Sequence, residues 1–317
     1  MKTLSDAHYN TVVGALEDGD VVPLLGAGAN LCGRSDATGW KPHENLPSGR
    51  DLAAYLAERF RCPVDKGEDL IRVSQYVALL RGPKPLFREL HDLFDADYPP
   101  TAVHRFVAGI PAILRERSHP VRRQLIVTTN YDDALERAFL ASGEPFDVVS
   151  YVAERRYRGK FVHWPHGEHP RVIEIPNEYA DISLDERTVI LKLHGLVDRG
   201  DPDSLWESFV ITEDHYIEYL TRTTLSEHLP SVLAEKLHNC NLLFLGYSLR
   251  DWNLRVILHR IWKDRDYQWP SWAVQIDPDP IDEKFWDEHD VEMFDVPLER
   301  YVQVLEDRLR APALARD

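Results

Sequence analysis

Five short apolar runs constrain the fold of this chain more than any other feature, because each of them ends abruptly in glycine or polar residues. The runs lack the alternation of a half-exposed strand and are typical of strands buried on both faces of a sheet. Amphipathic helical patterns separate them. With their ends, the runs read VVPLLGAGAN (21–30), QLIVTTN (124–130), TVILKLHG (188–195), NLLFLGYS (241–248) and SWAVQID (271–277).

This alternation predicts an α/β fold, a Rossmann-like parallel sheet with helices on both faces. We expect a single domain over residues 1–317. Within it, residues 31–118 begin with glycines and prolines and continue in helical patterns, which predicts a loop and a helical subdomain. Residues 145–187 are rich in proline, histidine and arginine and are predicted to form an irregular insertion with short strands.

The ends of the five runs predict one ligand site. Parallel strands end at the same edge of a sheet, and open α/β sheets bind ligands outside that edge. Gly26 and Gly28 would let the backbone approach a pyrophosphate closely. Leu31, however, stands where the usual dinucleotide fingerprint has a third glycine. A tight turn that needs two glycines therefore explains this stretch as well as phosphate binding does.

Three other strand ends also have structural explanations. Asn130 opens a helix over 131–142, and Asp133 follows three residues later, as in a capping box. Ser248 could contact a ribose or phosphate, or could cap the next helix. His194, taken alone with the glycine that follows it, is typical of a loop histidine with a satisfied hydrogen bond.

Taken in order, GAGAN, TTNYD, KLHG, GYSLRDWN and QID resemble the sirtuin-like NAD-binding domain, in the divergent form found in bacterial antiviral defence proteins. The resemblance extends from about residue 20 to about residue 290. It implies that NAD is the ligand and that Asn130 and His194 are catalytic. Asn130 would orient the nicotinamide ribose or a water, and His194 would act as a general base or orienter while the bond to nicotinamide breaks.

The same resemblance implies which residues contact NAD. Asp132 would hold the carboxamide, Ser248 would lie near the adenosine ribose, and Asp277 would contact the adenine-side ribose. The glycine turn would bind the phosphates. The residues expected to bind NAD are Gly26, Ala27, Gly28, Asn30, Thr129, Asp132, Gly246, Ser248 and Asp277.

Departures from the protein-deacylating sirtuins narrow the expected activity. Those enzymes hold a structural zinc with two C-x-x-C pairs between the catalytic histidine and the Gly-x-Ser turn, whereas this chain has only Cys240 between His194 and Gly246. It also lacks their Gly-Ile-Pro-x-Phe-Arg stretch. Both losses argue against acyl-lysine binding and fit the defence branch, whose members hydrolyse NAD to nicotinamide and ADP-ribose and deplete the infected cell. The alternatives are a module that senses NAD or ADP-ribose without turnover and, less favoured, a protein deacylase.

No metal is expected. The chain has three cysteines, none of them in a C-x-x-C pair, so a thiolate zinc cage cannot be built. Histidines and a glutamate cluster within residues 163–169, but such a cluster in an irregular insertion is more typical of a solvated loop than of a metal site.

The charge balance argues against strong nucleic-acid binding by the chain itself, since the net charge is −16. The compact basic run at 154–160 is best explained as a solvated or partner-facing loop.

The remaining expectations concern location and partners. No apolar run approaches the length of a membrane span, and the first residues lack a secretory pattern, so we expect a cytoplasmic protein without membrane contact. The chain shows no obvious sensor domain. The resemblance therefore implies a homo-oligomer, or an ATPase or translocase partner encoded in the same defence operon, as the trigger.

Overall fold

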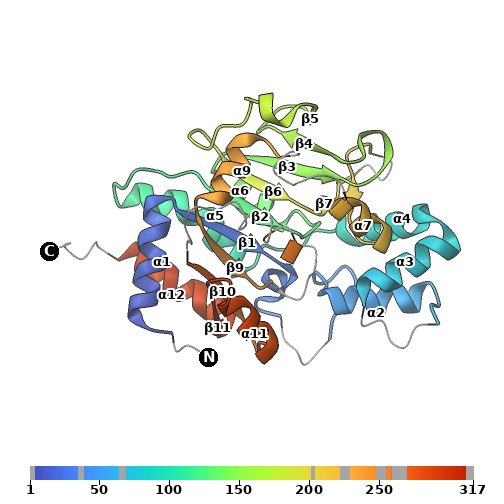
Figure 1. Ribbon diagram of the computed structural model, residues 1–317, viewed down its shortest axis with the longest axis horizontal. Helices are drawn as coiled ribbons and strands as arrows, with labels where there is room; N and C mark the ends of the chain where they lie inside the picture. Colours follow the sequence, from blue (N-terminus) through green and yellow to red (C-terminus); the bar gives the residue numbers. More distant parts are fainter. Residues whose placement is uncertain are drawn as a thin grey trace.

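A nine-stranded sheet forms the centre of the molecule (Figure 1). The computed structural model describes residues 4–34, 39–63, 69–200, 204–221, 229–247, 255–256, 258 and 270–311. Neighbouring strands from β11 to β3 pair in parallel, and β4 and β5 continue the sheet antiparallel beyond β3. In spatial order the strands are β11 (Val291–Asp295), β10 (Ser271–Gln275), β9 (Asn241–Leu245), β1 (Val21–Leu25), β2 (Leu125–Thr128), β6 (Thr188–Lys192), β3 (Phe146–Val152), β4 (Lys160–Trp164) and β5 (Arg171–Ile173).

Both faces of the sheet are covered by helices, as the continuous apolar strands predict. In β1, Val21 and Leu25 pack into one hydrophobic layer, while Val22 and Leu24 pack into the layer on the other face. The predicted Rossmann-like sheet is thereby confirmed. The first layer contains α1 (Asp6–Asp18), α5 (Ala102–Glu116), α6 (Ala134–Ser142) and α12 (Leu298–Arg310), and the second contains α7 (Glu213–Thr221), α9 (Ser231–His238) and α11 (Pro280–Asp287).

A third hydrophobic cluster joins a group of helices to the ends of the strands. These helices pack on Tyr131, which follows β2, and on Phe209 in the small sheet of β7 and β8. In Figure 1 they lie at the opposite end of the molecule from α1 and α12. Their predicted limits as a subdomain, 31–118, and the single domain over 1–317 stay predictions. The elements are α2 (Gly49–Arg59), α3 (Leu70–Arg81), α4 (Pro83–Phe94), β7 (Gly195–Leu196) and β8 (Ser208–Phe209).

The segment 145–187 is more regular than expected. Its first part forms β3, which pairs along its length with β6 inside the central sheet. All seven residues of β3 are buried. The prolines, histidines and arginines that follow β3 lie in β4, β5 and short turns, η4 (Arg155–Tyr157) and η5 (Pro176–Glu178). The biased composition of the whole segment concealed one strand of the core.

Buried polar groups fasten this segment to the sheet. The Nε2 atom of His163 lies 3.1 Å from an Asp147 carboxylate oxygen, and its Nδ1 lies 2.8 Å from the Tyr179 hydroxyl. The side chains of His163 and Asp147 are completely buried. His163 therefore does not belong to a solvated histidine loop, although His166 and His169 are exposed.

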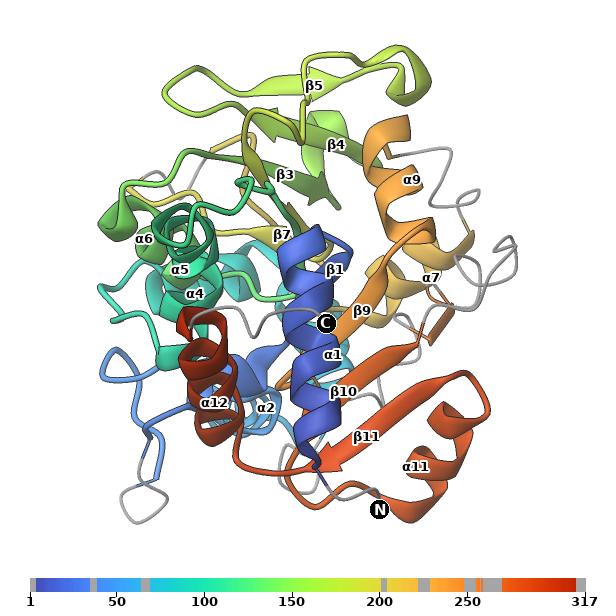
Figure 2. The same ribbon diagram turned by 90° about the vertical axis from the view of Figure 1, so that its left-hand side faces the viewer.

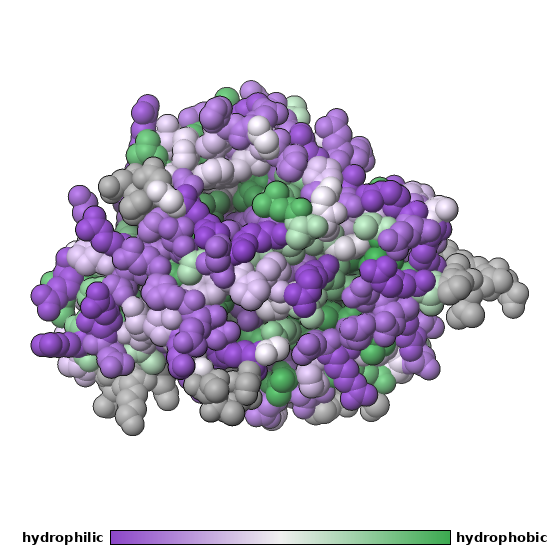
Figure 3. All heavy atoms as spheres, turned by 180° about the vertical axis from the view of Figure 1, so that it is seen from behind, coloured by the Kyte–Doolittle hydropathy of each residue, from purple (hydrophilic) through white to green (hydrophobic). Residues whose placement is uncertain are grey.

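The outer surface is mostly polar where Figure 3 views it from behind, with smaller groups of hydrophobic residues between the hydrophilic ones. Among the described residues, no helix is both long enough and apolar enough to cross a membrane.

The first and last helices are joined by a buried histidine. Figure 2 shows α1 lying over the sheet beside α12. The Nε2 atom of His8 in α1 lies 2.9 Å from the Tyr301 hydroxyl of α12, and the His8 ring also contacts Phe294. Burial lowers the pKa of His8 from 6.5 to about 4, although Glu292 opposes this shift. The folded protein thus holds His8 uncharged at neutral pH.

We predict that this histidine makes folding sensitive to mild acid. Below pH 6.5 the unfolded chain binds a proton at His8, whereas the folded chain does so only near pH 4, so stability is lost as the pH falls between these values. Between about pH 7 and about pH 5, the wild type should lose about 2 kcal/mol more than His8→Gln. Urea unfolding of both proteins at each pH measures this difference. Parallel losses in the two proteins would contradict the prediction.

Candidate functional site

Five neighbouring strands bring the predicted site residues to one edge of the sheet. Strands β10, β9, β1, β2 and β6 are adjacent and parallel, so their carboxyl ends lie side by side. The chain passes from β1 to β2 on one side and later returns to β9 on the other side of β1. The ends of β1 and β9 therefore flank the topological switch point, where open α/β sheets bind ligands.

Three glycines close the gap between β1 and β9. The Gly28 N–H donates to the Gly246 carbonyl at 2.8 Å, and the Gly26 N–H donates to the Leu245 carbonyl at 3.2 Å. A Cβ atom on Gly28 would lie 2.5 Å from the Gly246 oxygen. Gly246 has a φ of +63°, and a Cβ atom there would lie 2.4 Å from the Ala29 nitrogen. Gly28 and Gly246 thus meet backbone to backbone, while the Tyr247 ring lies beside Gly26, where a Cβ atom would lie 2.8 Å from it.

The close contact between the two strand ends is itself a reason for glycine at these positions, without any ligand. The N–H groups of Gly26 and Gly28 already donate to β9 and to the residue that follows it, so they are occupied in this conformation. The chain then continues as η1 (Ala27–Leu31), a single short 3₁₀ turn. A phosphate-binding role for Gly26, Ala27 and Gly28 stays a prediction.

We predict that alanine at either Gly28 or Gly246 lowers the free energy of unfolding by at least about 2 kcal/mol, since backbone atoms must separate to admit the new methyl group. Gly14→Ala is the matched control because no atom lies within 4 Å of its added Cβ in the middle of α1. That variant should be stabilised by up to about 1 kcal/mol. Chemical denaturation of the three variants tests the contrast, and equal effects in all three would refute it.

Asn130 lies at the end of β2 and contacts the glycine turn. Its Nδ2 atom donates to the Gly26 carbonyl at 3.1 Å and to the Asn30 side chain at 3.4 Å. Its backbone N–H donates to the Thr128 hydroxyl at 3.1 Å. The predicted capping role is wrong, because α6 begins only at Ala134. Residues 131–133 lie before the helix, so Asn130 is too far from its first turn to cap it.

Asp132 belongs to the same group of side chains. One carboxylate oxygen accepts a hydrogen bond from Asn30 Nδ2 at 2.8 Å, and the other accepts one from the Ala134 N–H at 3.1 Å. The Asp132 side chain therefore takes the place at the start of α6 that the sequence assigned to Asn130. Asn30 links Asn130 and Asp132 to each other.

His194 follows β6 by two residues and is 4% exposed. Its ring meets the Tyr216 ring of α7 edge-on, with 5.5 Å between the centroids, and its carbonyl accepts a hydrogen bond from the Val210 N–H. The next residue, Gly195, has a φ of +89°, and a Cβ atom there would lie 2.0 Å from the Ser208 carbonyl oxygen. The glycine after the histidine is thus required by the contact between β7 and β8.

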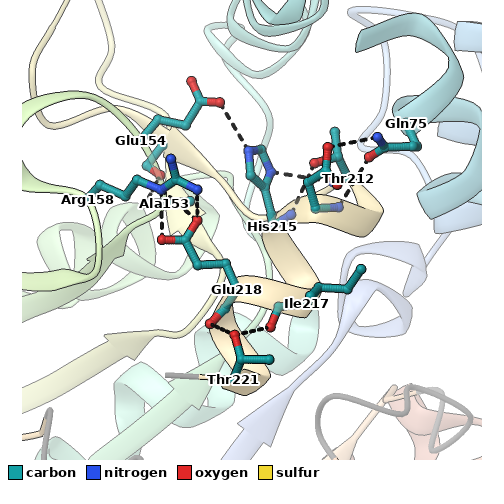
Figure 4. A network of polar contacts seen from close by, with 11 residues as sticks. Gln75, Ala153, Glu154, Arg158, Thr212, His215, Ile217, Glu218 and Thr221 are labelled. Atoms are coloured by element: carbon teal, nitrogen blue, oxygen red, sulfur yellow. Dashed lines mark hydrogen bonds and ion pairs between the residues drawn. The ribbon is translucent and has the colours of Figure 1, made fainter. Parts of the chain in front are cut away.

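The helix that carries Tyr216 is held on two sides (Figure 4). His215 Nε2 lies 3.1 Å from Glu154, and Glu218 pairs with Arg158, so α7 is fastened to the connection between β3 and β4. Gln75 of α3 donates to Asp214 at 2.9 Å from the other side. Arg158 of the basic run at 154–160 is exposed, and its ion pair with Glu218 links this loop to the helix beside His194.

The other predicted residues are placed less tightly. Thr129 donates its N–H to the Leu25 carbonyl at 3.4 Å. Asp277, just after β10, is exposed, has a φ of +50°, and donates its N–H to Asp295 at 3.1 Å. Ser248 lies outside the described residues. The contacts of Thr129 and Asp277 with NAD stay predictions, as does that of Ser248.

A model of the SIR2-like domain family matches residues 124–294, which is more than half of the chain. The chain belongs to this SIR2-like family. The matched region includes Asn130, Asp132, His194 and Gly246, and it begins after the turn that holds Gly26.

Three relatives extend the similarity to most of the chain. Defense-associated sirtuin 2 of Bacillus subtilis is 24% identical over 84% of this chain and 22% of its own length. The NAD(+) hydrolase ThsA of Acinetobacter baumannii (strain 532279) is 26% identical over 74% of this chain and 38% of its own length. ThsA of Cytobacillus dafuensis is 24% identical over 74% and 37%. The SIR2-like chain thus spans well under half the length of these relatives.

This SIR2-like chain carries its cysteines far apart. Cys240 is buried, whereas Cys32 and Cys62 are partly exposed, and all three are free thiols. Within the described ranges, no group of three or more histidine, cysteine and acidic residues is arranged to hold a metal ion.

Sequence reasoning missed several polar residues beneath the site of this SIR2-like chain. Thr101 donates its hydroxyl to the Ala29 carbonyl at 2.8 Å. Lys192, the last residue of β6, donates to the Asp132 carbonyl and lies 2.7 Å from the Glu136 carboxylate. A lysine inside an apolar strand demands a buried partner. The lysine of the KLHG motif could therefore have predicted a buried acidic or carbonyl partner.

Proposed function

We propose that the chain is an NAD hydrolase that releases nicotinamide and ADP-ribose. The observation that carries this proposal is the position of Asn130 and His194 at the ends of neighbouring strands, β2 and β6, beside the switch point of a SIR2-like sheet. Two of the relatives are named NAD(+) hydrolases, which supports the same reaction here.

The proposed reaction uses water as the nucleophile. Water attacks C1′ of the nicotinamide ribose, and the bond from C1′ to the nicotinamide nitrogen breaks with its electron pair passing to that nitrogen. A proton of the water passes to His194 and then to solvent. NAD and water thereby give nicotinamide, ADP-ribose and a proton. Positioned general bases of this kind contribute roughly a hundredfold to ten-thousandfold in rate.

Asn130 would orient the ribose or the water. Its Nδ2 group already donates to Gly26 and Asn30, which fixes the plane of the amide. Its Oδ1 atom is then the group that can accept a hydrogen bond from a ribose hydroxyl or a water. Asp132 would accept from the nicotinamide carboxamide, since a carboxylate oxygen can accept more than one hydrogen bond.

The cellular role follows from the reaction. We propose that the chain depletes NAD during antiphage defence, in line with the name of the Bacillus subtilis relative. Such depletion requires access to the cytoplasmic pool of NAD. Self-assembly into a homo-oligomer, or an ATPase or translocase partner encoded nearby, would supply the trigger. The absence of a C-x-x-C pair keeps a protein deacylase less favoured.

A sensor that binds NAD without turnover is the second candidate, because the 4% exposure of His194 limits access to its ring in this conformation. Binding alone does not require a proton acceptor at this place. The His194 variant below therefore distinguishes the two functions.

We predict that NAD stabilises the chain under both functions. A ligand at about a hundredfold over its dissociation constant adds roughly 2.7 kcal/mol to the free energy of unfolding. Thermal melting of a turnover-deficient variant with millimolar NAD or ADP-ribose measures this. An unmoved melting temperature would show that the site is misassigned.

We predict that His194→Ala lowers the rate of nicotinamide release by roughly a hundredfold to ten-thousandfold, while folding and the thermal response to NAD are retained. Asn130→Ala should act in the same direction. His169→Ala, a change at an exposed histidine, is the matched control and should leave the rate unchanged.

Free nicotinamide is followed by chromatography, with and without candidate activating partners. If His194→Ala retains more than about a tenth of the wild-type rate, His194 is not the general base. If neither protein releases nicotinamide with any activator while both bind NAD equally, the sensor function replaces the hydrolase.

A further inference from the structure

We propose that Lys192 is a positioning residue, which together with Glu136 fixes the segment from Asn130 to Asp132 relative to β6, the strand that ends two residues before His194. This inference deepens the proposed NAD hydrolysis and rests on it. Nothing in the family resemblance assigns a role to either residue.

The contacts of Lys192 reach the segment directly. Lys192 pairs with Thr128 across the strands β6 and β2, and its side chain is completely buried. Its ammonium group donates to the Asp132 carbonyl oxygen and to Glu136, which lies in the first turn of α6. One cation therefore joins β6, the segment after β2 and the helix that follows.

The segment is also held from its other side. The Asp132 carboxylate accepts from Asn30, and Asn130 donates to Asn30 and Gly26. These bonds fix side chains against the glycine turn, whereas Lys192 fixes the backbone of Asp132 from the side of β6. Without Lys192, the segment would keep its bonds to η1 and the bond from the Val197 N–H to the Tyr131 carbonyl, but the backbone of Asp132 would lose its bond to β6.

The Lys192 ammonium group is the positive charge that the neighbouring groups respond to. Burial raises the pKa of Glu136, and the neighbouring Lys192 opposes that shift. His104 is 1% exposed, and burial lowers its pKa to about 4, so at neutral pH it adds no second positive charge beside Asp132. In the described part of the chain, the second Glu136 oxygen is buried without a hydrogen-bond partner. Of the two Glu136 carboxylate oxygens, the one that bonds to Lys192 is thus the one with a hydrogen-bond partner.

A buried lysine could equally serve stability alone, so the test must separate the two roles. Removing one member of a buried ion pair leaves an unmatched charge and destabilises the fold, whereas replacing both members by neutral residues of similar size is often tolerated. The double variant Lys192→Met/Glu136→Gln removes the bond to the Asp132 carbonyl and leaves no unmatched charge.

The matched control is Arg123→Met/Glu144→Gln. Arg123 and Glu144 form an ion pair of 2.9 Å, and the Glu144 side chain is 4% exposed. Glu144 also pairs with Arg115, whose side chain is 53% exposed and therefore stays solvated when Glu144 is replaced. They precede β2 and β3, at the opposite edge of the sheet from Asn130. A general loss of buried ion pairs would affect both double variants alike.

Three measurements are made on the full chain. Thermal melting should place the Lys192→Met/Glu136→Gln variant within a few degrees of the wild type. Hydrogen exchange of the ligand-free protein should show the N–H groups of residues 129–134 exchanging about tenfold faster or more, with β2 and β6 unchanged. Nicotinamide release should show kcat lowered by about tenfold or more and KM changed by less than about threefold, because misplaced groups cost rate more than binding. The control should match the wild type in exchange and kcat.

Different outcomes test the positioning role of Lys192 and the proposed NAD hydrolysis. A folded double variant with wild-type exchange at 129–134, or with kcat within about twofold of wild type, overturns it. If the wild type itself releases no nicotinamide with any activator, the hydrolase proposal fails, and hydrogen exchange alone then accepts or rejects the positioning role. If the double variant does not fold, Lys192→Arg, which keeps the charge but displaces the donor atoms, is measured in its place with the same expectations.

Discussion

The backbone contact between the ends of β1 and β9 is the constraint on which the site depends. Gly28 and Gly246 approach so closely that neither tolerates a Cβ atom. This contact fixes η1, and η1 in turn places the Ala29 carbonyl against Thr101 and the Asn30 side chain against Asp132. The position of Asn130 therefore follows from a contact at the switch point that involves no side chain.

The two candidate catalytic residues contact different elements, although Tyr131, which follows Asn130, donates its hydroxyl to the same Val210 that donates its N–H to His194. Asn130 is fixed by the glycine turn and Asn30, whereas His194 lies against α7. That helix is fastened to the β3–β4 connection and to α3 (Figure 4).

The sequence predicted what depends on continuous burial and on strand ends. The five apolar runs became adjacent strands because only a covered sheet buries them, and their ends met at one edge because parallel strands share a direction. Two features escaped prediction because they depend on contacts distant in sequence. The strand β3 pairs with β6 inside a segment of biased composition, and Lys192 contacts Glu136 only after β2 and β6 align. The start of α6 was misplaced for a local reason, since the Asp132 carboxylate, not the Asn130 side chain, accepts from the Ala134 N–H.

The charges beneath the site suit a substrate that loses its positive charge on reaction. The ammonium group of Lys192 is matched by Glu136, and His104 is uncharged at neutral pH, so neither group offsets the Asp132 carboxylate. If NAD binds as proposed, its cationic nicotinamide ring meets this excess negative charge in a poorly solvated place, where electrostatic attraction is stronger than in water. Cleavage makes the departing nicotinamide neutral. The attraction that would hold the substrate then disappears for the product, so the carboxylate proposed to bind NAD would not retain nicotinamide.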